Sequence, residues 1–331
     1  MSDILVSCVV PVFNAARHLP ALTDMLAKQH SNDFEVIFVD DGSTDESGAM
    51  LDSISASGKF SSRVIHQANG GASAARNAGM AAAQGRYVTF LDADDGIADD
   101  YAAVITRHAN EGRELTVFNH SRVVDGDFWY DIPAADEKIC SAEEMLEDFI
   151  KNPTGFGVYD FLIKRELIEK NGIRFPEGYP YYEDYDFILH VLAVAGDIVR
   201  AGECIYCYRA APGSAMSTFN DKRMECLELF EGERGLYLKS IPEFCARFQK
   251  WFIARLRWSV MWQACVSMDA GAARDFGRRW NMRSYMKRLT DYPDRRVSIS
   301  ARIYLMCPYI YIMTMGILGR RRTLIQRGAE K

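Results

Sequence analysis

The first 120 residues alternate between short apolar runs and longer stretches in which apolar residues recur every three or four positions. The apolar runs, rich in Val, Ile and Phe, are Leu5–Val12, Glu35–Val39, Arg63–His66, Tyr87–Leu91 and Leu115–Asn119. The stretches with helical spacing are Leu19–Gln29, Asp45–Ser57, Ser73–Ala83 and Asp100–Ala109. Near-continuous apolar strands separated by helices are typical of a parallel sheet covered on both faces, so the pattern predicts an α/β fold.

Three polar clusters stand where predicted strands end. They are Pro11–Asn14, Asp40–Asp45 and Asp92–Asp95. In open parallel sheets, ligands bind beyond the carboxyl ends of the strands, so the three clusters predict one shared binding site. No G-x-G-x-x-G follows the first strand, which argues against a dinucleotide site.

The second cluster favours nucleotide recognition. Asp45 fits the acidic first turn of a helix, whereas Asp40 and Asp41 precede that turn at the edge of the sheet. A carboxylate in that position can accept a hydrogen bond from the imide N–H of a uracil or from a ribose hydroxyl.

A glycine-rich segment, "NGGASAARNAG" at 69–79, lies between the second and third clusters. Gly70 and Gly71 let the backbone approach a ligand closely, and Arg76 and Asn77 follow in the first turns of the next helix. Arg76 suits a phosphate or a carboxylate of the third cluster. The alternative is a solvated arginine beside an asparagine that packs the helix.

The third cluster, "DADD", favours a divalent cation. Asp92 and Asp94 form a D-x-D after a buried strand, and Mg²⁺ and Mn²⁺ prefer carboxylate oxygen. An EF-hand loop that started at Asp92 would need a glutamate at its twelfth position, which is Ala103. A phosphatase of the haloacid dehalogenase type would need a different residue at Asp95. A solvated acidic turn remains as the structural alternative.

Four segments together resemble the family 2 glycosyltransferases of the GT-A fold. They are "VVPVFNAARHL", "EVIFVDDGSTDES", "QANGGASAARNAGMAAAQGRYVTFLDADD" and "YYEDYDF". The resemblance is strong across residues 5–100, looser across 155–217 and absent beyond. It implies a Rossmann-like, mostly parallel sheet flanked by helices. It also implies inverting transfer of a sugar from a nucleoside diphosphate sugar, most commonly a UDP-sugar, with Mn²⁺ or Mg²⁺, in bacterial surface-polysaccharide synthesis.

The resemblance also implies roles for individual residues. The nucleotide-sugar-binding residues would be Pro11, Phe13, Asn14, Asp41, Arg76, Asp92, Arg209 and Ser214. Of these, Pro11 and Phe13 would line the base pocket and Asp41 would bond the uracil-like edge. Asp94 would ligate the metal.

The acceptor region would supply the catalytic base. Inversion needs one group that takes the proton from the acceptor hydroxyl as it attacks the anomeric carbon. The family places this base at the Asp of an E-D pair, which is Asp184 here, with Glu183 in support. The alternative is that both acids merely form the first turn of a helix.

Acidic and basic residues are segregated along the chain, although the formal net charge is only −6. Residues 1–246 hold 21 Lys and Arg against 40 Asp and Glu, whereas residues 247–331 hold 18 against 5. We expect a catalytic domain at 1–217, with a nucleotide-sugar half at 1–120 and an acceptor half at 121–217. A helical, basic annex would occupy 218–331, with helical spacing at Lys222–Tyr237 and Glu243–Val266.

The basic annex predicts contact with an anionic membrane through residues 295–322. Its apolar stretch Ile303–Gly319 is interrupted by Pro308 and flanked by arginines, which are Arg295, Arg296 and Arg302 before it and Arg320, Arg321 and Arg322 after it. We expect it to lie in the cytoplasmic leaflet, with Tyr304, Tyr309 and Tyr311 at the headgroup boundary. The first residues do not resemble a secretory signal, so the expected location is cytoplasmic and peripheral to the membrane.

Two functional hypotheses from different classes follow. The first is a metal-dependent inverting glycosyltransferase that uses a glycan or lipid-linked acceptor. The second is a degenerate sugar-nucleotide-binding or scaffold protein, against which the intact Asp41, Asp94 and Asp184 argue. A processive synthase is disfavoured because "ARLRW" at 254–258 lacks the Gln of Q-x-x-R-W. Nothing in the sequence predicts nucleic-acid binding.

Overall fold

The computed structural model describes residues 4–29, 31, 33–124, 136–210, 219–230 and 242–328. The chain forms two compact units. The first comprises Met1–Leu146 and Thr154–Ala211, and the second comprises Glu147–Pro153 and Pro212–Lys331.

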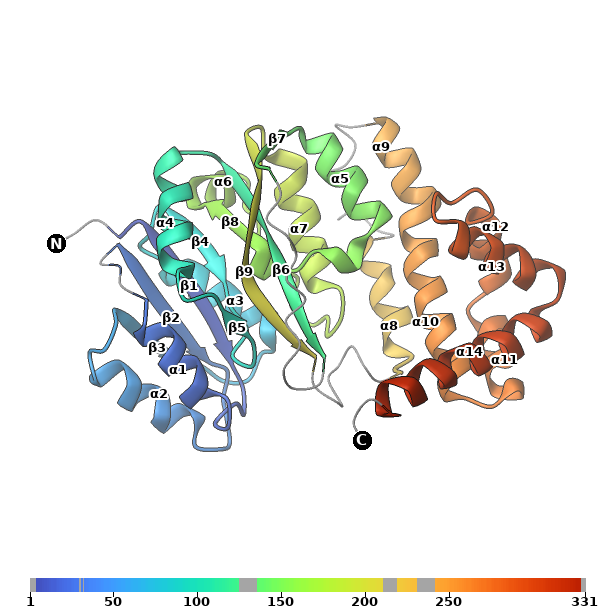
Figure 1. Cartoon of the computed structure of the whole chain (residues 1–331), viewed down its shortest axis with the longest axis horizontal. Coiled ribbons are helices and arrows are strands. Elements are labelled where there is room, and N and C mark those ends of the chain that lie inside the picture. The colour runs from blue at the N-terminus through green and yellow to red at the C-terminus, as the bar shows by residue number, and fades with distance from the viewer. Residues whose placement is uncertain are drawn as a thin grey trace. The chain divides into compact units, whose positions relative to one another are not determined.

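The first unit is built on one mixed sheet with the strand order β3-β2-β1-β4-β8-β6-β9-β5, and β7 pairs with β9 (Figure 1). The strands are β1 Val6–Val12, β2 Phe34–Asp40, β3 Ser62–His66, β4 Tyr87–Phe90, β5 Gly96–Ile97, β6 Leu115–Val124, β7 Lys138–Cys140, β8 Phe161–Lys164 and β9 Ile198–Ala210. Strands β1 to β4 are parallel, as is the pair β6–β9, whereas β8, β5 and β7 pair antiparallel. The expected mostly parallel sheet flanked by helices is confirmed, with a mixed second half.

The helices of the first unit cover both faces of the sheet. They are α1 Leu19–Ala27, α2 Ser47–Ala56, α3 Ala72–Ala82, α4 Tyr101–Glu111, α6 Arg165–Lys170 and α7 Glu183–Val194, with a 3₁₀ turn at Val158–Asp160. Helix α5 Ala142–Lys151 begins in the first unit and ends in the second, and the 3₁₀ turn Pro153–Gly155 leads back to the first. Every strand and helix predicted in the first 120 residues is present, with ends shifted by a few residues.

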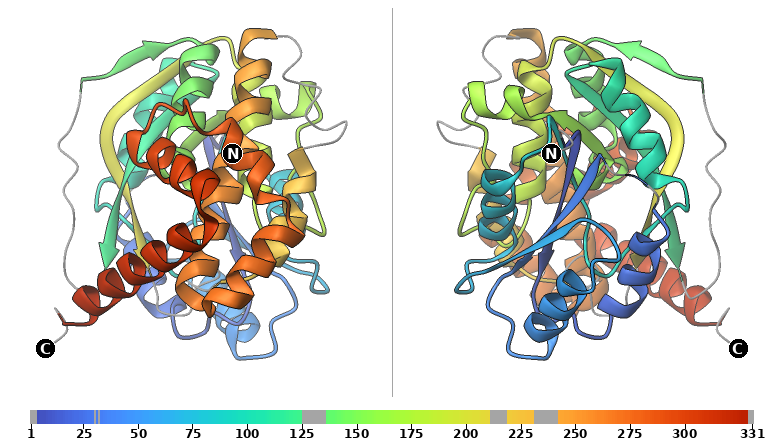
Figure 2. Two further views of the ribbon diagram at one scale, coloured as in Figure 1. Left: turned by 90° about the vertical axis from the view of Figure 1, so that its right-hand side faces the viewer. Right: turned by 90° about the vertical axis from the view of Figure 1, so that its left-hand side faces the viewer.

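Alternation along β1 explains why helices flank both faces, because successive side chains of a strand point to opposite sides. Cys8 and Val10 are buried in the cluster that includes the apolar residues of α1 and α4. Val9 faces α3, where a Cβ on Gly79 would lie only 2.3 Å from Val9 Cγ1. Glycine therefore allows α3 to pack closely on the sheet, on the side opposite α1 and α4 (Figure 2).

The second unit is helical. Its elements are α8 Lys222–Cys226, a 3₁₀ turn at Leu227–Phe230, α9 Pro242–Arg247, a π-helical turn at Phe248–Phe252, α10 Ile253–Ser267, α11 Ala270–Arg279, α12 Met282–Arg288, α13 Arg295–Met306 and α14 Pro308–Gly328. The prediction of helix at Glu243–Val266 is confirmed. At Lys222–Tyr237 it is confirmed as far as Phe230, and the rest lies outside the described residues.

The apolar stretch predicted to contact a membrane is divided between α13 and α14 at Pro308. Two of its three tyrosines were predicted wrongly. Tyr304 and Tyr311 are 4% and 0% exposed and pack edge to face at 5.1 Å, because they fill the core beneath the two helices. Tyr309 is 56% exposed. Within the described part of the chain, each helix is too short or too polar to cross a membrane.

Candidate active site

Two loops at the carboxyl edge of the sheet are tied together by hydrogen bonds. Asn14 has a left-handed backbone (φ 49°), and its Oδ1 accepts a hydrogen bond from the backbone N–H of Thr44 at 2.8 Å. Its own N–H donates to Ser43 Oγ at 3.0 Å. The backbone of Ala15 likewise donates to Ser47 Oγ at 2.9 Å. These bonds hold the first and second polar clusters in one rigid edge, as the strand-end argument predicts.

Asp41 is bound mainly by the glycine-rich segment. Its Oδ1 accepts hydrogen bonds from Gln67 Nε2 at 2.7 Å and from the N–H of Gly70 at 2.9 Å, and Oδ2 accepts one from the N–H of Gly71 at 2.7 Å. A carboxylate offers about four lone-pair sites, so one site on Oδ2 remains for a ligand. Asp40 turns away instead, because its carboxylate accepts from the N–H of Ser43 and contacts the ring of His66.

Arg76 is buried between two acidic groups. Its Nη2 donates to Asp92 Oδ1 at 2.9 Å, and its Nη1 lies 3.6 Å from Glu183 Oε1. The guanidinium also lies over the ring of Phe175, with 5.4 Å between its carbon and the ring centroid. Although only 6% of Arg76 is exposed, its Nε and Nη1 have no hydrogen-bond partner among the described residues. The predicted position of Arg76 beside the acidic turn is therefore confirmed, and the alternative of a solvated arginine is excluded.

The three acids of the third cluster point in three directions. Asp92 binds Arg76, whereas Asp94 lies at the pocket edge with an exposed side chain. Partial desolvation of its carboxyl by the surrounding atoms and, second, the charge of Asp92 raise the pKa of Asp94. Asp95 is buried and accepts hydrogen bonds from Tyr206 Oη at 2.5 Å and from the N–H of Arg209 at 2.7 Å. Burial and the charge of Asp92 raise the pKa of Asp95 to about 8.

A pocket of about 640 Å³ opens between these loops. Among its lining residues are seven that the sequence singled out, namely Pro11, Phe13, Asn14, Asp41, Arg76, Asp92 and Asp94. The ring of Phe13 is 51% exposed although it is apolar, so its face is available to a flat ligand. The pocket thus combines an exposed aromatic ring with an arginine and three aspartates.

Glu183 and Asp184 form the first turn of α7, so the helix interpretation of this pair is correct. Burial raises the pKa of Asp184 to about 7, and the charge of Glu183 adds to the rise while Arg76 opposes it. Burial likewise raises the pKa of Glu183, against the effect of Arg76. A carboxyl that titrates near neutrality suits a proton acceptor. A role in the helix turn does not exclude a role in chemistry.

Arg209 and Ser214 are the remaining residues predicted to bind the nucleotide sugar. Arg209 meets the site through its backbone N–H, which donates to Asp95. Ser214 lies outside the described residues, as do the side chains of Arg320, Arg321 and Arg322. The sequence analysis missed the anchoring role of Asp95 and missed Tyr206 altogether. These two residues are 111 positions apart, and no local pattern signals their contact.

Comparison with known proteins agrees with this geometry. The model of the family described as glycosyl transferase family 2 matches residues 7–172, which is half of the chain. The chain therefore belongs to glycosyl transferase family 2, and its fold is the GT-A fold. Among curated relatives, it is 32% identical over 216 residues to EpsJ of Bacillus subtilis, an uncharacterized glycosyltransferase. That match covers 63% of this chain and 62% of the relative, so the chain spans less than two thirds of its length.

Further relatives and solved structures are similar over longer spans. Glycosyltransferase GlyG of Streptococcus pneumoniae is 30% identical over 227 residues, which are 65% of this chain and 73% of GlyG. The crystal structure of S. aureus TarS 1–349 in complex with UDP-GlcNAc shares 19% identity and a TM-score of 0.65, covering 96% of this chain and 92% of TarS 1–349. Mannosyltransferase PcManGT from Pyrobaculum calidifontis, in complex with GDP-Man and Mn²⁺, covers 92% of this chain and 87% of its own at 15% identity and a TM-score of 0.51.

Proposed function

We propose that the protein is an inverting, metal-dependent glycosyltransferase of bacterial cell-surface polysaccharide synthesis. It moves a sugar from a nucleoside diphosphate sugar, with UDP as the carrier, to a glycan or lipid-linked acceptor. Family membership supports the reaction class, and the UDP-GlcNAc complex of TarS supports the carrier. The name of a further relative, amylovoran biosynthesis glycosyltransferase AmsB of Erwinia amylovora, supports the polysaccharide.

The buried guanidinium of Arg76 carries this proposal. A buried cation with unpaired N–H groups costs free energy unless a ligand completes its hydrogen bonds. Its Nε and Nη1 have no hydrogen-bond partner among the described residues, although Nη1 lies 3.6 Å from Glu183, and Arg76 lines the pocket together with Asp92 and Asp94. A diphosphate offers the anionic oxygens that a guanidinium binds best. The exposed ring of Phe13 offers a surface on which a base can stack.

The acidic turn fits a divalent cation. Asp94 lines the pocket, and desolvation together with the neighbouring charge of Asp92 raises the pKa of the Asp94 carboxyl. A bound cation relieves both effects, because it stabilises the ionised carboxylate. Oxygen donors favour Mn²⁺ or Mg²⁺, and the Mn²⁺ in the PcManGT complex supports the same choice. Asp94 would hold the ion, which neutralises charge on the departing diphosphate when bound.

A side chain of the protein would accept the proton that the acceptor hydroxyl loses as it attacks the sugar. Asp184 takes it from the acceptor hydroxyl, and a pKa of about 7 lets this carboxyl be both ionised and basic near neutral pH. Glu183 holds Arg76 beside Asp92 and thereby keeps the two halves of the site together. The catalytic domain would comprise residues 1–217, with donor binding in 1–120 and acceptor binding in 121–217. Arg209 and Ser214 would approach the diphosphate.

The helical region 218–331 would hold the enzyme on the anionic cytoplasmic leaflet, where lipid-linked acceptors reside. An exposed apolar strip supports this proposal, and its members are Ile299, Met306, Tyr309, Ile310, Met313, Ile317 and Leu318. Arg295 and Arg302 are exposed on α13 at helical spacing from Ile299 and Met306, so basic and apolar groups share a face. This combination is typical of helices that lie in a membrane interface.

Calorimetry of UDP binding with and without Mn²⁺ tests the proposal. Wild-type protein should bind UDP more tightly with Mn²⁺, and Asp94→Asn should lose that dependence while its circular dichroism is unchanged. Asp99→Asn is the matched control, because Asp99 is exposed nearby but does not line the pocket. Unchanged Mn²⁺ dependence in Asp94→Asn would refute the metal assignment. UDP-sugar binding without hydrolysis or transfer to any acceptor would favour the degenerate scaffold instead.

A further inference from the structure

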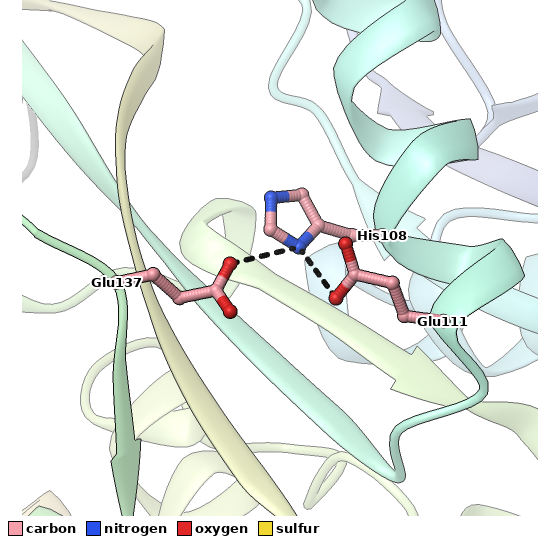
Figure 3. Close-up of side chains that lie close together, drawn as sticks. All are labelled: His108, Glu111 and Glu137. Carbon is pink, nitrogen blue, oxygen red and sulfur yellow. Dashed lines mark ion pairs between the residues drawn. The ribbon is translucent and has the colours of Figure 1, made fainter.

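A second cluster of candidate metal ligands lies at the end of α4, among residues that do not line the pocket. His108 and Glu111 are three positions apart on one face of the helix, and Glu137 precedes β7 (Figure 3). His108 Nδ1 lies 3.6 Å from Glu111 Oε2 and 3.9 Å from Glu137 Oε2. The three ligand atoms all lie within 4.8 Å of one another. Neighbouring ligands of a tetrahedral ion with bonds of about 2.1 Å are roughly 3.4 Å apart, so small side-chain shifts suffice.

The imidazole of His108 is buried with one nitrogen unsatisfied. Its side chain is 0% exposed and packs edge to face on Phe118 at 5.1 Å. Nδ1 has no hydrogen-bond partner among the described residues, although it points between the two carboxylates. A buried polar atom without a hydrogen-bond partner costs free energy, which a bound ligand would recover. The unsatisfied Nδ1 of His108 is therefore a second observation, besides the two carboxylates, that points to a ligand at this cluster.

The other nitrogen of His108 faces an arginine and a carboxylate, and a carboxylate is a group to which metal-binding histidines commonly donate. Nε2 lies 3.4 Å from Glu203 Oε2 on β9, and Arg107 Nη2 lies 3.1 Å from the same nitrogen. When Nδ1 binds a cation, Nε2 carries the ring proton and donates a hydrogen bond to Glu203, so the guanidinium of Arg107, which is itself a donor, gives up its contact with Nε2. Arg107 keeps ion pairs with Glu203 and Glu111. A carboxylate behind the imidazole fixes its tautomer and raises its basicity.

Local charge also favours a divalent cation. Glu111, Glu137 and Glu203 converge on His108, and Arg107 is the cation that pairs with two of them. One arginine leaves two of the three carboxylate charges uncompensated among these groups. A divalent ion balances them. A donor set of one imidazole and two carboxylates suits Zn²⁺ better than Mg²⁺, which prefers an all-oxygen shell and keeps several waters.

We propose that His108 Nδ1, Glu111 and Glu137 bind one Zn²⁺, with Glu203 as the hydrogen-bond acceptor behind the imidazole and water in the remaining position. The ion joins the last turn of α4 to the entry of β7 and, through Glu203, to β9. The ion stabilises the first unit by cross-linking these elements, and the site is independent of the donor site.

Calorimetric titration of chelator-treated, full-length protein with Zn²⁺ tests this site. The parent protein for this experiment carries Asp94→Asn, and so do all variants, so that Zn²⁺ binding by the donor-site aspartate does not contribute to the measured heat. We expect one Zn²⁺ per chain with a Kd in the micromolar range or below. Glu137→Gln and His108→Phe should each weaken it at least 30-fold, and Glu203→Gln by about 10- to 100-fold. Glu137 is exposed, so its substitution does not threaten folding, and His108→Phe preserves the ring that packs on Phe118.

Glu166→Gln is the matched control, since Glu166 is an exposed glutamate of the same unit outside the cluster. The Kd of this variant for Zn²⁺ should match that of the parent. Zn²⁺ should also raise the Tm of the parent but not that of Glu137→Gln, whereas Mg²⁺ at the same concentration should leave both unchanged. Absence of Zn²⁺ binding in the parent would overturn the site. Equal Zn²⁺ affinity in the parent, Glu137→Gln and His108→Phe would overturn it as well.

Discussion

Asn77 and Phe175, 98 residues apart in the chain, exchange two hydrogen bonds. Asn77 Nδ2 donates to the carbonyl of Phe175 at 3.0 Å, and the N–H of Phe175 donates to Asn77 Oδ1 at 2.9 Å. The side-chain amide thus pairs with the backbone as another strand would. Arg76 stands next to Asn77 and lies over the ring of Phe175. The pair fixes the segment before α7 against the helix that carries Arg76.

Replacing Asn77 with alanine should therefore destabilise the protein by about 1–3 kcal/mol, because it leaves a buried backbone N–H and C=O without partners. Urea unfolding measured by fluorescence gives the free-energy difference. Asn110→Ala is the control, because Asn110 is exposed on α4, and its free energy of unfolding should stay within about 0.5 kcal/mol of wild type. Equal stability of both variants would show that the paired hydrogen bonds contribute nothing net.

The sequence predicted most of the pocket residues named here, because the information that places them is local. Apolar runs and helical spacing fixed β1 to β4 and the helices between them, and parallel strands bring their carboxyl ends to one edge. Asp41, Arg76 and Asp94 therefore fell in one pocket as expected. Asn77 does not line this pocket, and its side chain pairs with the backbone of Phe175 instead.

Local patterns could not predict the contacts between segments that are far apart in the sequence. The pairing of Asp95 with Tyr206 and of Asn77 with Phe175 depends on how antiparallel β8 and the long β9 complete the sheet. Tyr311 was predicted at a membrane surface because hydropathy cannot distinguish a helix face packed on protein from one packed on lipid.

The exposed ring of Phe13 predicts a second outcome. Phe13→Ala should lower UDP affinity about 10-fold or more, since base–aromatic stacking contributes roughly 1–3 kcal/mol. Stability should change little, because the ring is 51% exposed in the free protein. Phe13→Tyr keeps the stacking face and should restore affinity in the same calorimetric titration. If alanine and tyrosine bind UDP alike, Phe13 does not contact the base.

Asp184→Asn should lower turnover by a factor of about 10² to 10⁴, the range for loss of a general base, while UDP affinity stays near wild type. In the wild type, kcat/KM should fall about tenfold per pH unit below pH 7, since the carboxyl must be ionised to accept a proton and its pKa is raised to about 7. Initial rates of transfer from pH 5 to 9 test both statements. A variant that keeps more than half of the activity would assign Asp184 to the helix turn alone.

The raised pKa of Asp184 also predicts how stability depends on pH: stability should fall as pH rises, whereas kcat/KM should rise. Between the unfolded pKa near 4 and the folded pKa of about 7, the folded state holds the proton of Asp184 and the unfolded state does not, so wild-type stability falls as pH rises through this window. Asp184→Asn removes this titration. Its Tm should therefore fall less than that of wild type between pH 5 and pH 8. Parallel Tm curves for the two proteins would mean that the carboxyl titrates normally.

The exposed apolar strip of α13 and α14 predicts membrane binding that surface substitutions can remove. Met306, Ile310 and Ile317 are 86%, 56% and 53% exposed, so replacing all three with serine should leave the fold intact. Deleting the chain after Val297 is a poorer test, because it also removes the buried Tyr311. Each inserted apolar side chain contributes up to about 1.5–3 kcal/mol, so the triple variant should lose at least 100-fold in affinity for vesicles.

Co-sedimentation with vesicles of anionic and of neutral lipid, at low and high salt, measures this affinity. Wild type should bind anionic vesicles at low salt, and Arg295→Gln should weaken that binding about 5-fold, since a basic residue near such a surface contributes about 1 kcal/mol. Ile139→Ser is the control, because Ile139 is 64% exposed in the first unit and should have no effect. Donor hydrolysis should persist in the triple variant, whereas transfer to a lipid-linked acceptor in vesicles should fall. Wild-type protein that ignores anionic vesicles at low salt would contradict the membrane assignment.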